Sequence, residues 1–217
     1  EVTLEIPAGG PYRIDTSLET KSTVPDLTWL YRGDCVLHLG VGNLFIIAGQ
    51  SNSAGYSRDF CIDPPSMDVH LYRNRSKWDI ASHPMNESTF AGSLANEEMG
   101  VPGVSPYLAF GKTYGKMTGM PVGLIQTSLG GSPMERWNPK DGDLYLNMVD
   151  KIHQTGGRYA GVLWYQGCSD TNPGPAEKYL EHFREYVEAT RKELGYEIPF
   201  FTMQLNRQIN GINDECW

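Results

Sequence analysis

Short apolar runs alternate with longer amphipathic stretches along most of the 217-residue chain. Five of these runs are rich in β-branched or aromatic residues and are bounded by glycine or polar residues, a pattern typical of strands. Because the runs are largely apolar throughout and are separated by helical patterns, they predict a parallel sheet covered on both faces. The predicted strands are residues 44–48, 69–72, 122–126, 161–165 and 199–204.

Three amphipathic stretches between these runs predict helices. Ser105 and Pro106 are typical of an N-cap followed by a first-turn proline, and they predict a helix that runs to about residue 117. Residues 144–154 and 176–194 predict the other two helices, with Gly156 and Gly195 where C-terminal glycines occur. Since parallel strands are joined by right-handed crossovers, this order of elements predicts a three-layer α/β/α fold.

Residues 1–40 follow a different pattern. Their alternation has no helical period, so they predict a β-rich N-terminal lead-in that precedes a single domain over residues 41–217. Within that domain, residues 64–104 include a long stretch that reads as loop, and such loops in compact domains are usually functional or disordered.

Composition and charge exclude several kinds of partner. A net charge of −8 argues against nucleic acid and anionic membrane surfaces, because both require clustered Lys and Arg. No apolar stretch approaches the roughly 20 residues of a membrane-spanning helix. The four cysteines contain no Cys-x-x-Cys pair, so we predict no zinc site and no other metal or cofactor. They fit two disulfides in a secreted protein or buried thiols in a cytosolic one.

Three predicted strand ends break into small and polar residues. In open parallel sheets, ligands bind beyond the carboxyl ends of the strands. The sequence therefore predicts a functional site built from three segments, which we call the first, second and third motifs: "AGQSNSAG", "QTSLGGSPMERW" and "WYQGCSDTNPG".

Individual residues of these motifs suit the chemistry of acyl transfer. Ser51 stands where a strand ends at a turn, a position that suits either an exposed nucleophile or the N-cap of a helix. Gly130 and Gly131 allow a backbone N–H to approach a developing oxyanion, or they form only a tight turn. Gln166 and Ser169 offer side-chain donors from the neighbouring strand end.

Taken together and in this order, the three motifs resemble the sialate O-acetylesterase-like branch of the SGNH hydrolases, which includes carbohydrate esterases of the acetylxylan esterase type. The resemblance covers roughly residues 40–205 and implies a flavodoxin-like fold with Ser51 as nucleophile. It also implies an oxyanion hole formed by the Ser51 amide, a backbone amide of the Gly130-Gly131 turn and a side chain of the third motif. The asparagine usual in the wider superfamily is absent here, and Gln166 is the expected substitute. The residues that carry the resemblance are "GQSN", "SLGGSP" with Trp137, and "WYQG" with Ser169-Asp170.

The chain departs from the family pattern in its acid and base. The family branch usually has glutamate where this chain has Cys168, which we interpret as a packed thiol. A serine nucleophile needs a histidine base, usually oriented by a carboxylate, and the family places both in an Asp-x-x-His motif after the last strand. The sequence ends at Trp217 before such a motif, so we expect a C-terminal truncation. Asp150 and His153 have the Asp-x-x-His spacing. Their helix, however, leads into the amino end of a strand, on the opposite side of the sheet from Ser51.

The resulting hypothesis is a metal-independent serine esterase that removes O-acetyl groups from a carbohydrate partner such as acetylated xylan or sialic acid. Two alternatives remain: a carbohydrate-binding or structural relic without its base, and the same fold acting on a lipid or thioester. A polymeric substrate favours secretion or the periplasm, and the sequence predicts no oligomeric state. Trp137 and Trp164 suit either a sugar-binding surface or the core. The predicted pocket residues are Gln50, Asn52, His83, Arg136 and Ser169, of which His83 is also a candidate base.

Overall fold

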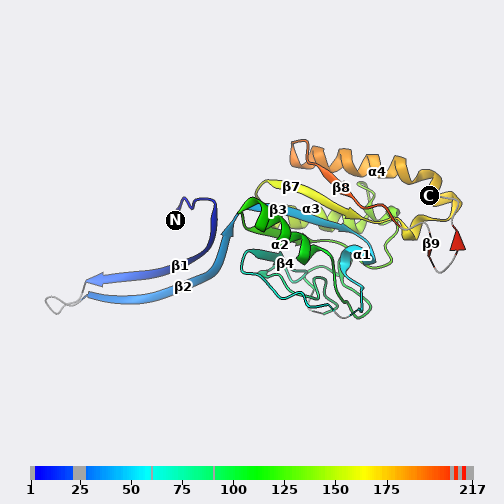
Figure 1. The fold of residues 1–217 in the computed structure, drawn as a ribbon. Coiled ribbons are helices and arrows are strands. Elements are labelled where there is room, and N and C mark those ends of the chain that lie inside the picture. Colours follow the sequence, from blue (N-terminus) through cyan, green and yellow to red (C-terminus); the bar gives the residue numbers. More distant parts are fainter. Residues whose placement is uncertain are drawn as a thin grey trace.

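The computed structural model describes residues 3–21, 28–59, 61–89, 91–205, 208–209 and 212–213. Much of this chain forms a six-stranded sheet with helices on both faces (Figure 1). The strands lie in the order β5-β4-β6-β3-β7-β8. Their bounds are β3 Asn43–Gly49, β4 Val69–Tyr72, β5 Trp78–Ile80, β6 Val122–Gln126, β7 Tyr159–Tyr165 and β8 Phe200–Thr202.

The sheet is parallel except at one edge. The central strand β3 pairs in parallel with β6 and β7, and the outer strands β4 and β8 continue this direction. The predicted parallel sheet and its five strands are therefore confirmed. The exception is β5, which pairs antiparallel with β4. The sequence pattern does not predict β5, because a strand of three residues, two of them exposed, shows no usable alternation.

Helices cover both faces of this sheet, as the three-layer prediction requires. α2 Tyr107–Thr118 packs on one face, and α3 Asp143–Thr155 and α4 Pro173–Leu194 pack on the other (Figure 1). α4 begins three residues before its predicted start, because a proline is tolerated in the first turn of a helix. In the described ranges, no helix combines the length and the apolarity that crossing a membrane requires.

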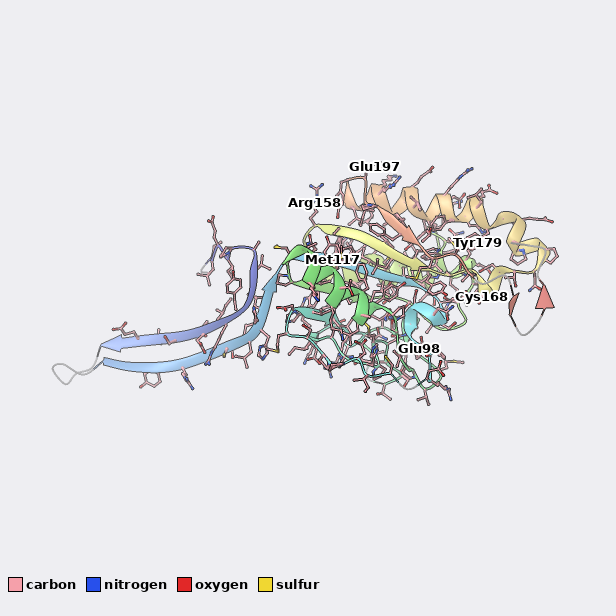
Figure 2. All side chains as sticks on the ribbon, in the orientation of Figure 1. Glu98, Met117, Arg158, Cys168, Tyr179 and Glu197 are labelled. Carbon is pink, nitrogen blue, oxygen red and sulfur yellow. The ribbon has the colours of Figure 1, made fainter. Side chains whose placement is uncertain are left out.

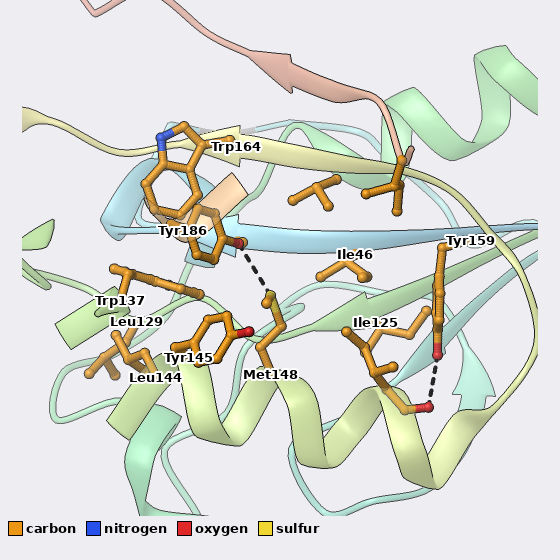
Figure 3. Close-up of a cluster of buried hydrophobic side chains, with 14 of the residues drawn as sticks. Ile46, Ile125, Leu129, Trp137, Leu144, Tyr145, Met148, Tyr159, Trp164 and Tyr186 are labelled. Carbon is orange, nitrogen blue, oxygen red and sulfur yellow. Dashed lines mark hydrogen bonds between the residues drawn. The ribbon is translucent and has the colours of Figure 1, made fainter. Parts of the chain in front are cut away.

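The alternation of side chains along β3 divides the core into two clusters. Ile46 points into the cluster under α3 and α4, whereas Ile47 points into the cluster under α2. The first cluster is rich in aromatic rings (Figure 3). Within it, Trp137 and Trp164 are 0% and 2% exposed, and their rings meet edge to face at 5.1 Å. Both tryptophans are therefore core residues, and neither offers a face to a sugar.

An antiparallel hairpin extends away from the sheet (Figure 1). It consists of β1 Gly9–Lys21 and β2 Thr28–Val41, and β2 leads into the amino end of β3. The hairpin is thus attached where the strand β3 begins, at the opposite end of this strand from Ser51. The division of the chain into a lead-in and one domain stays a prediction. A second short antiparallel pair is formed by β9 Gln208–Ile209 and β10 Ile212–Asn213.

Candidate active site

Ser51 lies at the carboxyl end of the central strand. β3 ends at Gly49, and Ser51 is the first residue of the short helix α1, Ser51–Ala54. Gly49 has a φ of 129°, and a Cβ at this position would lie 2.4 Å from the carbonyl oxygen of Tyr165. A glycine is therefore required for this close approach of β3 and β7. Ser51 is partly exposed, and its hydroxyl has no hydrogen-bond partner among the described residues.

The second motif is tied directly to the first. The amide of Leu129 donates to the carbonyl oxygen of Gly49 at 3.2 Å, and the Ser132 hydroxyl donates to the same oxygen at 3.3 Å. These two bonds bracket the Gly130-Gly131 turn. The turn is therefore held beside the residue that leads into Ser51.

The third motif is tied to the other two. Gln50 Oε1 accepts hydrogen bonds from the amides of Gly167 at 3.0 Å and Ser169 at 3.2 Å. Gln166 Nε2 donates to the carbonyl oxygen of Ser132 at 3.1 Å and to the carboxylate of Asp170. The three motifs thus form one hydrogen-bonded unit at the carboxyl ends of β3, β6 and β7. The convergence expected from the sequence is found, and it is more extensive than strand ends alone would produce.

The bonds within this unit change the assignment of oxyanion donors. Both N–H groups of Gln166 are engaged, so its side chain is not a free donor as the resemblance implies. The Gly130 amide is also engaged, because it donates to Glu98 Oε1 at 2.8 Å. The amides of Ser51 and Gly131 have no partner within the described ranges. These two amides are therefore free to donate to a bound ligand.

Two of the predicted pocket residues make structural contacts within the protein. Gln50 is 3% exposed and holds the third motif in place, as described above. Arg136 pairs with Asp143 and donates to the carbonyl oxygen of Ala95 at 3.0 Å, which braces the start of α3. By contrast, Asn52 is exposed next to Ser51, and Ser169 is partly exposed at the third motif.

Both ring nitrogens of His83 are engaged by partners other than Ser51. Its Nε2 lies 3.0 Å from Asp63 Oδ2, and its Nδ1 accepts from the Ser105 amide at 3.4 Å. A tautomer with the proton on Nε2 satisfies both bonds, so neither nitrogen is left to accept the proton of Ser51. His153 pairs with Glu193 at 2.7 Å on the surface of α3, as expected for a helix that leads to the opposite edge. None of the histidines in the described chain hydrogen-bonds to Ser51.

The electrostatics of Cys168 agree with its interpretation as a packed thiol. Cys168, a residue of the third motif, begins η3, Cys168–Asp170, and is partly buried (Figure 2). Burial raises the pKa of its thiol, which disfavours the thiolate that a cysteine nucleophile needs. Next to it, a pocket of about 410 Å³ lies between the ends of β7 and β8 and the first turns of α4.

Glu98 is a buried residue of this region that sequence reasoning missed. It is 3% exposed, and its carboxylate accepts hydrogen bonds from Asn86, Gly130 and Tyr56. Burial, followed by the hydrogen bond to Glu98, raises the pKa of Tyr56 to about 12, so the phenol keeps its proton at neutral pH. In the sequence, Glu98 is the second glutamate of "ANEEMG", and adjacent acids in a loop usually indicate solvated surface. No spacing or motif marks it.

Comparison with known proteins identifies relatives of this chain. A family model described as carbohydrate esterase, sialic acid-specific acetylesterase, matches residues 41–217. The probable carbohydrate esterase At4g34215 of Arabidopsis thaliana is 26% identical over an alignment of 173 residues, and the match covers 70% of this chain and 64% of that protein. The match therefore spans less than two thirds of the relative's length.

Solved structures share the fold at lower sequence identity. The X-ray structure of the Arabidopsis thaliana protein At4g34215 has a TM-score of 0.65 at 23% identity and covers 74% of this chain and 73% of that one. XAC1771, described as a novel carbohydrate acetylesterase from Xanthomonas citri, has a TM-score of 0.56 at 22% identity, over 90% of this chain and 46% of that one. The structure of NanS has a TM-score of 0.58 at 17% identity, over 74% of this chain and 66% of that one. At these identities the likeness shows the fold.

Proposed function

The chain belongs to the carbohydrate esterase family of the sialic acid-specific acetylesterase type, and from this premise we propose that it removes O-acetyl groups from a carbohydrate, with Ser51 as nucleophile. One observation carries the proposal: three strand ends, far apart in the sequence, are hydrogen-bonded to one another around Ser51. Groups that are fixed in advance around a reacting atom are what electrostatic stabilisation of a transition state requires.

The proposed reaction has two halves. In the first, Ser51 Oγ attacks the acetyl carbonyl carbon, its proton passes to a base, and the ester C–O bond breaks to release the sugar hydroxyl. In the second, water attacks the acetyl-Ser51 intermediate, and acetate leaves as Ser51 regains its proton. Each half passes through a tetrahedral oxyanion. The unpaired amides of Ser51 and Gly131 are the proposed donors to that oxyanion.

We propose that His83 is not the base that accepts the proton of Ser51. The proposal follows from the partners of His83, since Asp63 and Ser105 engage both of its ring nitrogens. A base in the wrong tautomer or orientation cannot accept the serine proton without first breaking these bonds.

The proposed substrate is an acetylated glycan such as acetylated xylan or an acetylated sialic acid. The description of the matching family and that of XAC1771 as a carbohydrate acetylesterase support an acetylated carbohydrate over a lipid or thioester. Because Trp137 and Trp164 are buried, the proposed contacts to the sugar fall on the exposed Asn52 and the partly exposed Ser169.

Trapping of the intermediate tests this proposal. The full-length protein is mixed with an acetylated oligosaccharide, quenched in acid and examined by mass spectrometry of its peptides. We expect one acetyl group on Ser51 and none in the Ser51→Ala variant. Binding of the oligosaccharide without an adduct and without release of acetate would instead favour a carbohydrate-binding protein derived from such an esterase.

A further inference from the structure

Three residues connect the helix that carries Ser51 to the turn that carries the proposed oxyanion donor. Tyr56 follows α1 by two residues, and its hydroxyl donates to Glu98 Oε2. Glu98 Oε1 in turn accepts from the Gly130 amide at 2.8 Å. The ring of Tyr56 also packs against Gly130, where a Cβ would lie 2.7–2.8 Å from three atoms of Tyr56. Tyr56, Glu98 and Gly130 therefore form a closed triangle of contacts.

Asn86 is a further residue that holds the Glu98 carboxylate in place. The Asn86 side-chain amide donates to Glu98 Oε1 at 2.6 Å and to the carbonyl oxygen of Ser128 at 3.1 Å. Both Asn86 and Glu98 are almost fully buried, and Figure 2 shows Glu98 close to the α1 ribbon. A carboxylate with three donors and little access to water has one orientation. The triangle is therefore rigid, and it includes part of the second motif.

We propose that Glu98 is a positioning residue of the oxyanion hole, an inference that rests on the proposed esterase function. By engaging the Gly130 amide, Glu98 fixes the plane of the Leu129–Gly130 peptide, the one directly before the peptide that carries the Gly131 N–H. The Gly131 amide, which has no partner in the described chain, is then held at a constant position relative to Ser51. Glu98 does not contact the substrate and acts through Gly130 and Tyr56.

The contribution of Glu98 is geometric and not electrostatic. A negative charge close to an oxyanion opposes its formation, so the charge of Glu98 brings no catalytic advantage. What the turn requires is an acceptor for the Gly130 amide at this place. Glutamine offers the same acceptor without the charge, and its amide can donate to the Tyr56 oxygen. Glu98→Gln should therefore keep the turn in place, whereas Glu98→Ala should not.

Steady-state hydrolysis of p-nitrophenyl acetate by the full-length protein tests the inference. The variants are Glu98→Gln, Glu98→Ala, Tyr56→Phe and the control Glu97→Ala, whose side chain has no hydrogen bond to a described residue. Loss of an oxyanion donor lowers kcat by roughly 100-fold or more, so we expect about that loss for Glu98→Ala, with KM changed by less than about twofold. We expect Glu98→Gln within about threefold of the wild type, and Tyr56→Phe between these two variants.

The outcomes separate this inference from the proposed function. Wild-type turnover that depends on Ser51, together with a low kcat in Glu98→Ala and rescue in Glu98→Gln, supports the positioning role. Equal kcat values in Glu98→Ala and Glu97→Ala overturn that role and leave the esterase intact. A loss of kcat in Glu98→Gln as large as in Glu98→Ala, with both variants folded by thermal denaturation, also overturns it. No wild-type turnover overturns the proposed function and this inference together.

Discussion

The amide of Gly167 donates a 3.0 Å hydrogen bond to the side-chain oxygen of Gln50, a residue 117 positions earlier in the chain. The bond joins the end of β7 to the residue that precedes Ser51. Since Gln50 is almost fully buried, the "GQS" segment is a structural joint as well as the carrier of a nucleophile. This relationship explains why a glutamine is found directly before Ser51, where a pocket residue was expected.

Gln50→Ala should therefore weaken the fold before it affects substrate binding. The variant leaves the amides of Gly167 and Ser169 without their acceptor, and one buried unpaired group costs about 1–3 kcal/mol. We expect a loss of that order in the free energy of unfolding, measured by urea denaturation. Gln50→Glu, which keeps an acceptor oxygen, should lose less. Equal losses in the two variants would contradict the role of this oxygen.

Gly49→Ala should be more damaging than an ordinary glycine substitution. Its φ of 129° is unfavourable for a side chain, and the new Cβ would lie 2.4 Å from the backbone oxygen of Tyr165. We expect a destabilisation of at least about 2 kcal/mol. The control is Gly174→Ala in α4, where a Cβ meets no atom within 4 Å. Equal Tm values for the two variants in thermal denaturation would contradict the conclusion that the close approach of β3 and β7 requires Gly49.

His83→Ala tests the proposal that His83 is not the base. Because both ring nitrogens of His83 are bound to Asp63 and Ser105, we expect kcat for acetyl-ester hydrolysis to fall by less than about threefold. His83→Gln provides a second variant that retains polar contacts if the alanine variant is unstable. A loss of roughly 100-fold or more in both folded variants would identify His83 as the base and contradict our proposal.

Lys151 should give the stability of the fold a distinct pH dependence. It is 1% exposed, and burial lowers its pKa from 10.5 to about 7. Between these values the unfolded chain binds a proton that the folded chain does not, so the free energy of unfolding rises with pH. The slope is at most about 1.4 kcal/mol per pH unit.

The variant Lys151→Met has no such slope, and it isolates this contribution. The acceptors of Lys151, Asn74 Oδ1 and the Gln126 carbonyl oxygen, both also accept from Asn96, so they keep a donor. We expect the stability of the wild type relative to Lys151→Met to increase from pH 7 to pH 10. Parallel urea-denaturation profiles for the two proteins would show that Lys151 titrates normally in the folded state.

The sequence predicts those parts of the structure that depend on local pattern. Apolar runs locate β3, β4 and β6 to within one residue, and the carboxyl-end rule correctly brings the three motifs to one edge. The partners within that edge are not predictable in this way. Gln50, Gln166 and Glu98 have their roles through contacts between loops more than 30 residues apart, and no periodicity encodes such contacts.

The central claim is tested most directly by the release of acetate from an acetylated oligosaccharide. The full-length protein is compared with Ser51→Ala and with the control Ser57→Ala, which removes an exposed hydroxyl shortly after α1. We expect turnover in the wild type and in Ser57→Ala, and a loss of at least about 1,000-fold in Ser51→Ala. Acetate release by folded Ser51→Ala at the wild-type rate would contradict the assignment of Ser51 as the nucleophile of a carbohydrate esterase.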